Sequence, residues 1–157
     1  MDKVVLFTPG RANNYIVKNY ELAQEVMNCV SEVFPSVRLE LIVNKAPEEV
    51  AMLMNAADCL LLTSLHEGSP NVVKEAMACN LPVVTVAAGD VVERLEFVQP
   101  SIVVNSRAAS DLARTVIQIL NDPTRSNGVL EINRQGLSRE AVAEKILEIY
   151  NRVNGTK

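Results

Sequence analysis

Two short apolar segments with a helix between them constrain the fold of this chain most strongly. Residues 59–62 read Cys-Leu-Leu-Leu and residues 83–86 read Val-Val-Thr-Val. Such continuous apolar runs are typical of strands that are buried on both faces of a parallel sheet. Parallel strands need a crossover connection, and a helix from Ser69 to about Cys79 would supply it. The pattern therefore predicts a β-α-β unit within an α/β domain.

The ends of this helix have recognisable sequence signals. Ser69 is predicted to accept a hydrogen bond from an unpaired backbone N–H, and Pro70 stands where its missing N–H costs nothing. Asn80 tolerates the left-handed conformation that often follows a helix. Pro82 then prevents the helix from continuing.

One side of the predicted helix suits a phosphorylated ligand. Asn71 and Glu75 lie one turn apart, opposite an apolar face made by Val72, Val73, Ala76, Met77 and Cys79. The backbone N–H groups of Asn71 and Val72 and the positive end of the helix dipole favour a phosphate. Glu67 and Glu75 flank this position, and because carboxylates are poor phosphate ligands, we expect them to accept hydrogen bonds from vicinal sugar hydroxyls. The pattern therefore predicts a nucleotide-sugar site.

The segment from Glu67 to Glu75 also resembles a known motif. Its Glu-x7-Glu spacing, followed by Ala-Met-Ala-Cys and by Pro82-Val83-Val84, is similar to the donor site of the family 4 retaining glycosyltransferases, which have the GT-B fold. The resemblance extends over nearly the whole chain. It implies that Glu75 holds the ribose hydroxyls of the donor and that Glu67 contacts the hexose hydroxyls. The backbone from Gly68 to Asn71 would contact the diphosphate and the sugar.

The same resemblance assigns two cations to the leaving diphosphate. Arg11 and Lys18 follow the first predicted strand and match a Gly-Arg and a Lys of the family, although the spacing between them is longer than usual and the loop must bulge. Fixed cations stabilise the negative charge that develops on a leaving group. The implied catalytic residues are therefore Glu67, Arg11 and Lys18. The implied donor-binding residues are Gly10, Arg11, Lys18, Glu67, Gly68, Ser69, Pro70, Asn71, Val72 and Glu75.

Residues 44–47 are the largest departure from the family pattern. The family usually has a glycine-containing loop, a helix and another strand here, whereas this chain passes directly into a helix predicted at 48–57. The region that contacts the base is therefore shortened or rebuilt. Asn44 and Lys45 are either base contacts or ordinary loop residues, and UDP-, GDP- and ADP-sugars all remain open as donors. Gly89 either approaches the donor, as a glycine of the family does, or serves a tight turn.

The remaining sequence predicts a single α/β domain. Strands are expected at 4–8, 37–43 and 101–104, and helices at 18–33, 108–120 and from Ser138 onward. A short helical segment through Leu95 and a turn at Asn127-Gly128 are also expected. The predicted buried stripes are Leu22, Val26, Cys29, Val30 and Val33, then Leu112, Val116, Ile119 and Leu120, and finally Val142, Ile146, Ile149 and Val153. The expected fold is a Rossmann-like domain, a parallel sheet with helices on both faces. The resemblance makes it the C-terminal half of a GT-B enzyme, whose last helix often crosses to the partner domain.

Composition narrows the function further. The net charge of −4 gives no electrostatic case for binding nucleic acid or an anionic membrane. No apolar run reaches the length of a membrane span, and the first residues lack a signal-peptide pattern, so the expected location is the cytoplasm, or the membrane periphery for the full-length enzyme. Cys29, Cys59 and Cys79 are predicted to be buried thiols rather than a disulfide or metal set. His66 is a single histidine and cannot form a metal cluster.

The resemblance implies transfer of a hexosyl unit from a nucleotide diphosphate sugar to a hydroxyl acceptor, with retention of configuration. No cofactor and no metal are expected, because the Asp-x-Asp pattern of metal-dependent transferases is missing. Enzymes of this fold have two domains, so residues 1–157 would be the donor-binding domain without its N-terminal acceptor domain, and inactive alone. Two alternatives remain: a non-catalytic nucleotide-sugar binding module, and a sugar-nucleotide epimerase of the same fold.

Overall fold

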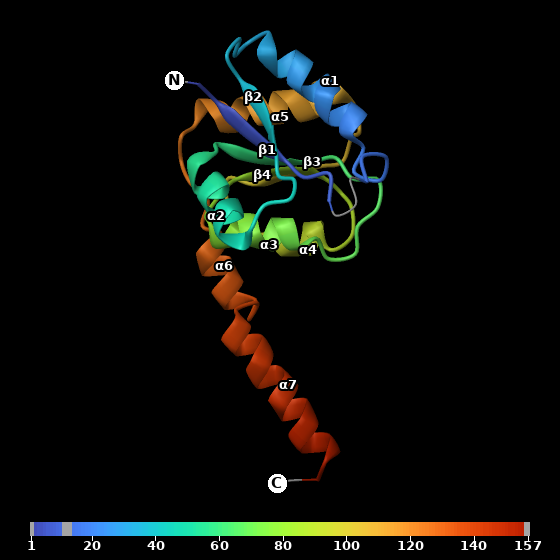
Figure 1. Cartoon of the computed structure of the whole chain (residues 1–157), viewed down its shortest axis with the longest axis vertical. Helices are drawn as coiled ribbons and strands as arrows, with labels where there is room; N and C mark the ends of the chain where they lie inside the picture. Colours follow the sequence, from blue (N-terminus) through green and yellow to red (C-terminus); the bar gives the residue numbers. More distant parts are fainter. Residues whose placement is uncertain (1, 11–13, 156–157) are drawn as a thin grey trace.

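The computed structural model describes residues 2–10 and 14–155 and shows helices and strands in alternation (Figure 1). The strands are β1 (Val4–Phe7), β2 (Arg38–Leu41), β3 (Cys59–Leu62), β4 (Val83–Val86) and β5 (Ile102–Val104). The helices are α1 (Tyr20–Ser31), α2 (Pro47–Ala56), α3 (Asn71–Ala78), α4 (Val91–Leu95), α5 (Ala109–Asn121), α6 (Gly128–Arg134) and α7 (Arg139–Val153).

The sheet has five strands in the order β2-β1-β3-β4-β5, and every neighbouring pair is parallel. β3 and β4 begin and end at the predicted residues and are buried along their whole length. Leu60 pairs with Val83 and Leu62 with Thr85 across these two strands. The chain thus crosses over between parallel strands through α3, and the prediction of a parallel sheet is confirmed.

Helices cover both faces of the sheet. α1 and α5 lie on one face, and α2, α3 and α4 lie on the other (Figure 1). Because side chains of a strand alternate between the two faces, Cys59 and Leu61 pack in the core beneath α1 and α5, whereas Leu60 and Leu62 pack against α2, α3 and α4. All four predicted inward residues of α5 are buried. The expected Rossmann-like α/β domain is confirmed.

The first helix is shorter than predicted. α1 begins at Tyr20 rather than Lys18, because Asn19 has a φ of 51° and therefore lies outside the right-handed helical region. The helix ends at Ser31, so the predicted stripe holds for Leu22, Val26 and Val30 but is wrong for Val33, which is 54% exposed.

The start of α3 differs from the prediction by one residue. Pro70 is the N-cap, and the Ser69 hydroxyl caps no backbone N–H but donates a 2.7 Å hydrogen bond to Asp90 Oδ2. The predicted capping role of Ser69 is therefore wrong, because an acid 21 positions away binds the hydroxyl. At the other end Asn80 has a φ of 51°, which confirms the predicted left-handed residue.

The predicted turn at Asn127-Gly128 is a helix start instead. Gly128 is the first residue of α6, and a Cβ there would overlap the Met77 carbonyl oxygen of α3. The glycine thus permits close helix packing rather than a hairpin turn. The Asn127 side chain accepts a hydrogen bond from Gln99 N at 2.8 Å and donates one to Phe97 O at 3.0 Å, which anchors the chain before the helix.

The last helix projects away from the sheet (Figure 1). Ser138 Oγ accepts a hydrogen bond from Ala141 N at 3.2 Å, as predicted for its N-cap. No residue of α7 is buried, and the apolar residues of its predicted stripe are all exposed: Val142, Ile146, Ile149 and Val153. None of the helices in residues 2–10 and 14–155 is both long and apolar enough to cross a membrane.

Candidate functional site

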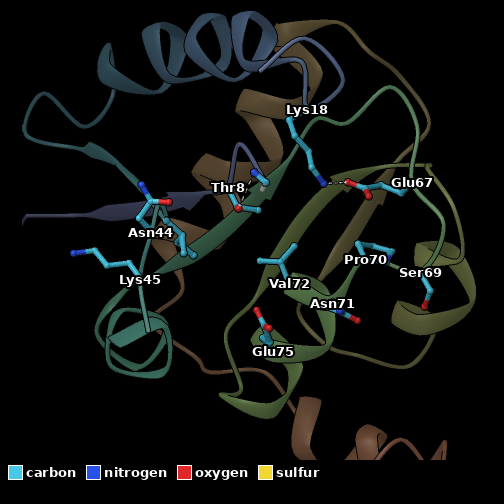
Figure 2. A pocket seen from close by; sticks show the side chains of 12 residues that line it. Thr8, Lys18, Asn44, Lys45, Glu67, Ser69, Pro70, Asn71, Val72 and Glu75 are labelled. Atoms are coloured by element: carbon cyan, nitrogen blue, oxygen red, sulfur yellow. Dashed lines mark hydrogen bonds and ion pairs between the residues drawn. The ribbon is translucent and has the colours of Figure 1, made fainter. Parts of the chain in front are cut away.

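A cavity of about 700 Å³ opens where the strands end at their carboxyl termini (Figure 2). Ligands of open α/β sheets usually bind at this edge. The loops after β1, β2 and β3 and the start of α3 form its walls. Its lining residues are Thr8, Gly10, Lys18, Ile42, Asn44, Lys45, Glu67, Ser69, Pro70, Asn71, Val72 and Glu75.

The structure brings most of the predicted donor-binding residues to this cavity. Eight of the ten line it: Gly10, Lys18, Glu67, Ser69, Pro70, Asn71, Val72 and Glu75. Gly68 lies in the same loop but is not a lining residue. Arg11 lies outside the described residues. Asn44 and Lys45 line the wall across the cavity from Glu67 (Figure 2).

Lys18 and Glu67 form an ion pair inside the cavity. The distance between Lys18 Nζ and Glu67 Oε1 is 2.5 Å, and the two side chains are only 16% and 11% exposed. Ser64 Oγ donates a second hydrogen bond to the same carboxylate oxygen at 2.6 Å. Hydrogen bonds to ionised groups are stronger than those between neutral groups. Both charged groups are therefore held in fixed positions before any ligand arrives.

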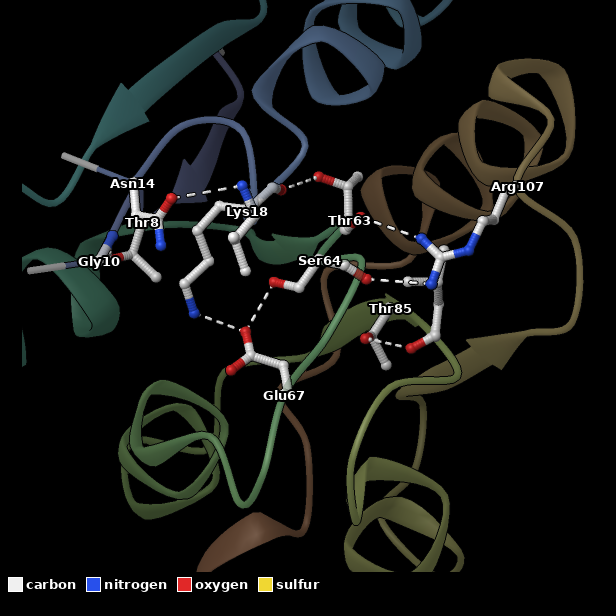
Figure 3. Close-up of polar contacts among 11 residues, drawn as sticks. Thr8, Gly10, Asn14, Lys18, Thr63, Ser64, Glu67, Thr85 and Arg107 are labelled. Carbon is white, nitrogen blue, oxygen red and sulfur yellow. Dashed lines mark hydrogen bonds and ion pairs between the residues drawn. The ribbon is translucent and has the colours of Figure 1, made fainter.

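Backbone contacts hold the two loops that carry this ion pair together. Leu65 N donates to Val17 O at 2.8 Å, and the Thr63 hydroxyl lies 2.8 Å from Lys18 O. On the far side of the same segment, the Arg107 guanidinium contacts carbonyl oxygens of residues 63–65 (Figure 3). Sequence reasoning missed Thr63, Ser64 and Arg107. The only signal available to it was that two hydroxyl residues directly follow a buried strand.

α3 presents its N-terminal end and one carboxylate to the cavity. Asn71 and Val72 are its first residues, so their backbone N–H groups have no partner within the helix. Glu75 lies one turn further on an exposed side of the helix and lines the cavity opposite Lys18 (Figure 2). The arrangement places a carboxylate at each end of the cavity and a helix N-terminus between them.

Lys45 and Glu75 also line a second, smaller cavity of about 350 Å³ between α2 and α3. The other residues around it are mainly apolar: Pro47, Val50, Ala51, Met54, Ala78 and Cys79. Lys45 is only loosely paired with Glu49, at 3.8 Å and with both side chains partly exposed. Such a surface pair adds little stability, so Lys45 is available to a ligand.

The turn after β4 packs against the loop after β3 and donates a hydrogen bond to it. Gly89 has a φ of 63°, and a Cβ there would overlap the Gly68 carbonyl oxygen, while Asp90 N donates to that oxygen at 3.0 Å. Gly89 does not line the cavity, so its geometry supports the tight-turn interpretation. Burial acts to raise the pKa of Asp90, but hydrogen bonds from Ser69 and Arg94 and the nearby positive charges outweigh it and lower that pKa. Asp90 is thus an anion at neutral pH.

The cysteines are free thiols in the structure. Cys59 is buried, whereas Cys29 and Cys79 are only partly buried, so the prediction of buried thiols holds fully for Cys59 alone. Burial raises the pKa of the Cys59 thiol to about 12. Within the described ranges, no three His, Cys, Asp or Glu side chains come together in a way that could hold a metal ion.

The sheet and the position of the cavity define a class of protein, a Rossmann-like domain of the GT-B type. Its fold is similar to that of sucrose-phosphate synthase from Thermosynechococcus elongatus, with a TM-score of 0.74 and 20% identity over 99% of this chain and 46% of that one. A mutant form of S. aureus TarM, solved in complex with fondaparinux, alpha-GlcNAc-glycerol and UDP, gives a TM-score of 0.75 and 17% identity over 95% of this chain and 35% of that one.

Sequence comparison identifies the family. A family model described as "Glycosyl transferases group 1" matches residues 5–122, and the chain belongs to this family. A curated relative, 2-deoxystreptamine glucosyltransferase from Streptomyces kanamyceticus, is 32% identical over 112 residues, which are 69% of this chain and 29% of the relative. The chain thus spans less than a third of the length of that curated relative.

Proposed function

We propose that the chain is the donor-binding half of a retaining glycosyltransferase that moves a hexosyl unit from a nucleotide diphosphate sugar to a hydroxyl acceptor. One observation carries the proposal: a single cavity contains the Lys18–Glu67 ion pair, the N-terminus of α3 and the Glu75 carboxylate. They provide a cation, a set of backbone N–H donors and two carboxylates that can accept hydrogen bonds from hydroxyl groups. A nucleotide sugar needs all three, since it combines a diphosphate with two sugar rings.

We propose a role for each residue from its match to the family motif and, where the structure describes it, from its place in the cavity. Glu75 accepts hydrogen bonds from the ribose, and the first N–H groups of α3 bind the diphosphate. Lys18 neutralises charge on the diphosphate, and Glu67 holds the hexose at the other end of the cavity. Arg11 is the second proposed cation, on the strength of its match to the family motif. Gly68 contributes through the backbone of the same loop.

The ion pair suits a reaction in which a diphosphate leaves. Lys18 is mostly buried, and a buried cation interacts with developing negative charge more strongly than one in water. Because Glu67 and Ser64 hold the loop in place, little reorganisation is needed when the charge develops. We propose that protein cations and the helix N-terminus carry this charge without a metal ion or a cofactor.

The acceptor side of the enzyme would come from another domain. The chain covers 46% of sucrose-phosphate synthase and 35% of TarM, and α7 exposes an apolar stripe from Val142 to Val153. We propose that an N-terminal acceptor domain closes the cleft over the cavity and that α7 contacts it. The isolated chain would then bind a donor but not turn it over. The free thiols agree with a reducing compartment such as the cytoplasm.

The proposal is tested by isothermal titration of the chain with UDP, GDP and ADP and with their glucose and mannose conjugates. We expect micromolar to millimolar binding of one nucleotide series, and Glu75→Gln to weaken it by about tenfold or more because a charged hydrogen-bond partner is lost. Glu25→Gln is the matched control, since Glu25 is exposed on α1 and does not line the cavity. Loss of affinity of the same size in both variants, or no binding to the wild-type chain, would count against the proposal.

Turnover separates an enzyme half from a binding module. The chain would be assayed for sugar transfer alone and with a separately supplied N-terminal domain. Transfer that depends on the added domain supports the half-enzyme, whereas binding without transfer in either case supports a non-catalytic module. Transfer by the isolated chain would contradict the proposed division into two halves.

A further inference from the structure

Arg107 stands in the loop between β5 and α5 and faces the segment that follows β3 (Figure 3). Its Nη1 lies 3.3 Å from Thr63 O, and its Nη2 lies 3.1 Å from Ser64 O and 3.5 Å from Leu65 O. One guanidinium thus contacts three successive backbone carbonyls. The planar, permanently charged fork of arginine suits this arrangement, and an ammonium group does not reproduce it.

These carbonyls need a partner because the sheet does not provide one. β3 ends at Leu62, so residues 63–65 lie beyond the paired part of the strand. Thr63 and Ser64 are nevertheless fully buried. A buried carbonyl without a hydrogen bond is costly, and Arg107 supplies donors from a part of the chain more than 40 residues away.

The same segment positions both members of the ion pair in the cavity. Ser64 Oγ donates to Glu67 Oε1 at 2.6 Å, and the Thr63 hydroxyl and the Leu65 N–H contact the backbone of residues 17–18. Arg107 itself does not line the cavity. Any effect of Arg107 on a ligand must therefore pass through residues 63–67.

The chain contains a second arginine with a comparable clamp elsewhere. Arg125 Nη1 lies 2.7 Å from Ala57 O, and its Nη2 lies 2.9 Å from Met54 O and 2.8 Å from Cys79 O. These carbonyls belong to the C-terminal ends of α2 and α3, whereas Glu67 precedes the N-terminal end of α3. Arg125→Ala is therefore a matched control for Arg107→Ala, because each variant loses three contacts between an arginine and backbone carbonyls.

We infer that Arg107 is a positioning residue that sets the place of the Glu67 carboxylate, and so the affinity for the hexose part of the donor. The inference rests on the proposed function, in which the Glu67 carboxylate binds the hexose. It makes a selective prediction. Loss of Arg107 weakens binding of the sugar more than binding of the nucleoside diphosphate, because Glu75 and the N-terminus of α3 also hold the diphosphate and Arg107 contacts neither of them.

The first test measures a ratio of affinities. UDP, GDP, ADP and their glucose and mannose conjugates are titrated into wild-type chain, Arg107→Ala, Arg107→Lys and Arg125→Ala. The affinity of each conjugate relative to its parent diphosphate is expected to fall about tenfold in Arg107→Ala, as for a lost charged hydrogen bond, and by an intermediate amount in Arg107→Lys. Arg125→Ala is expected to leave the ratio unchanged. Equal ratios in Arg107→Ala and Arg125→Ala would overturn the inference.

The second test needs no nucleotide. Amide hydrogen exchange at Leu65, whose N–H binds Val17 O, is expected to be at least about tenfold faster in Arg107→Ala than in Arg125→Ala. Unchanged exchange at Leu65 overturns the inference whether or not a nucleotide binds. If the wild-type chain binds no diphosphate or conjugate, the proposed function fails, and faster exchange confined to residues 63–67 still supports the positioning role. Should Arg107→Ala fail to fold, Arg107→Lys replaces it in both measurements.

Discussion

Substitution of Gly89 by alanine is expected to destabilise the domain through the loop that carries Glu67. Gly89 has a φ of 63°, and a left-handed conformation costs a residue with a Cβ about 1–2 kcal/mol. The new Cβ would overlap Gly68 O and lie 2.9 Å from Glu67 O, so the loop must move. That movement breaks the hydrogen bond from Asp90 N to Gly68 O, which is worth roughly 0.5–1.5 kcal/mol. The free energy of unfolding should fall by about 2–3 kcal/mol in total.

The assay is urea unfolding of the variant and of a neighbouring control. Gly68→Ala serves as the control, because a Cβ on Gly68 meets nothing within 4 Å and its φ is not in the left-handed region. The control should stay within about 0.5 kcal/mol of the wild type. In thermal unfolding, Gly89→Ala should lose roughly 5–10 °C for a domain of this length. Equal unfolding midpoints for the two variants would show that Gly89 does not support the loop as described.

Three further outcomes are expected. Burial raises the pKa of Cys59 from 9.0 to about 12, so between these values the unfolded chain loses a proton that the folded chain keeps, and stability falls as pH rises. At pH 10 the free energy of unfolding, measured in urea, should therefore be lowered by about 1 kcal/mol, an effect that is absent in Cys59→Ala. Nucleotide affinity should be the same in EDTA and in Mg²⁺, and a large loss in EDTA would contradict the proposal that protein cations carry the diphosphate charge. Deletion of residues 139–157 should change the stability of the domain by less than about 0.5 kcal/mol, because no residue of α7 is buried; a larger loss in urea unfolding would show that α7 supports the fold.

The parts of the fold that depend on local pattern could be predicted from the sequence. β3 and β4 are continuous apolar runs, and the structure places them at the predicted residues. The left-handed Asn80 and the serine cap of α7 also follow from intrinsic residue preferences. The motif from Glu67 to Glu75 indicated which residues meet in the cavity, because a strand, a loop and a helix start lie close in space whenever they are close in sequence.

The predictions that were wrong concern places where a residue distant in the sequence determines the local conformation or hydrogen bonding. Ser69 looks like a helix cap, but Asp90 binds its hydroxyl instead. Asn127-Gly128 looks like a turn, but the glycine is needed because α6 packs against Met77. Neither Asp90 nor Met77 belongs to the local pattern that suggested the prediction. Arg107 could not be found for the same reason, since the carbonyls that it contacts are 42 to 44 positions away.

These distant contacts explain how the loop at residues 63–69 can be rigid without regular secondary structure. Residues 63–69 belong to no helix or strand, so no ladder of backbone hydrogen bonds fixes their conformation. Instead, hydrogen bonds to three separate parts of the chain hold them. These parts are residues 17–19, Arg107 and residues 89–90. A ligand that meets a loop fixed in this way loses little binding energy to ordering it. Under the proposed function, the affinity for the hexose would therefore depend on these supports as well as on Glu67 itself.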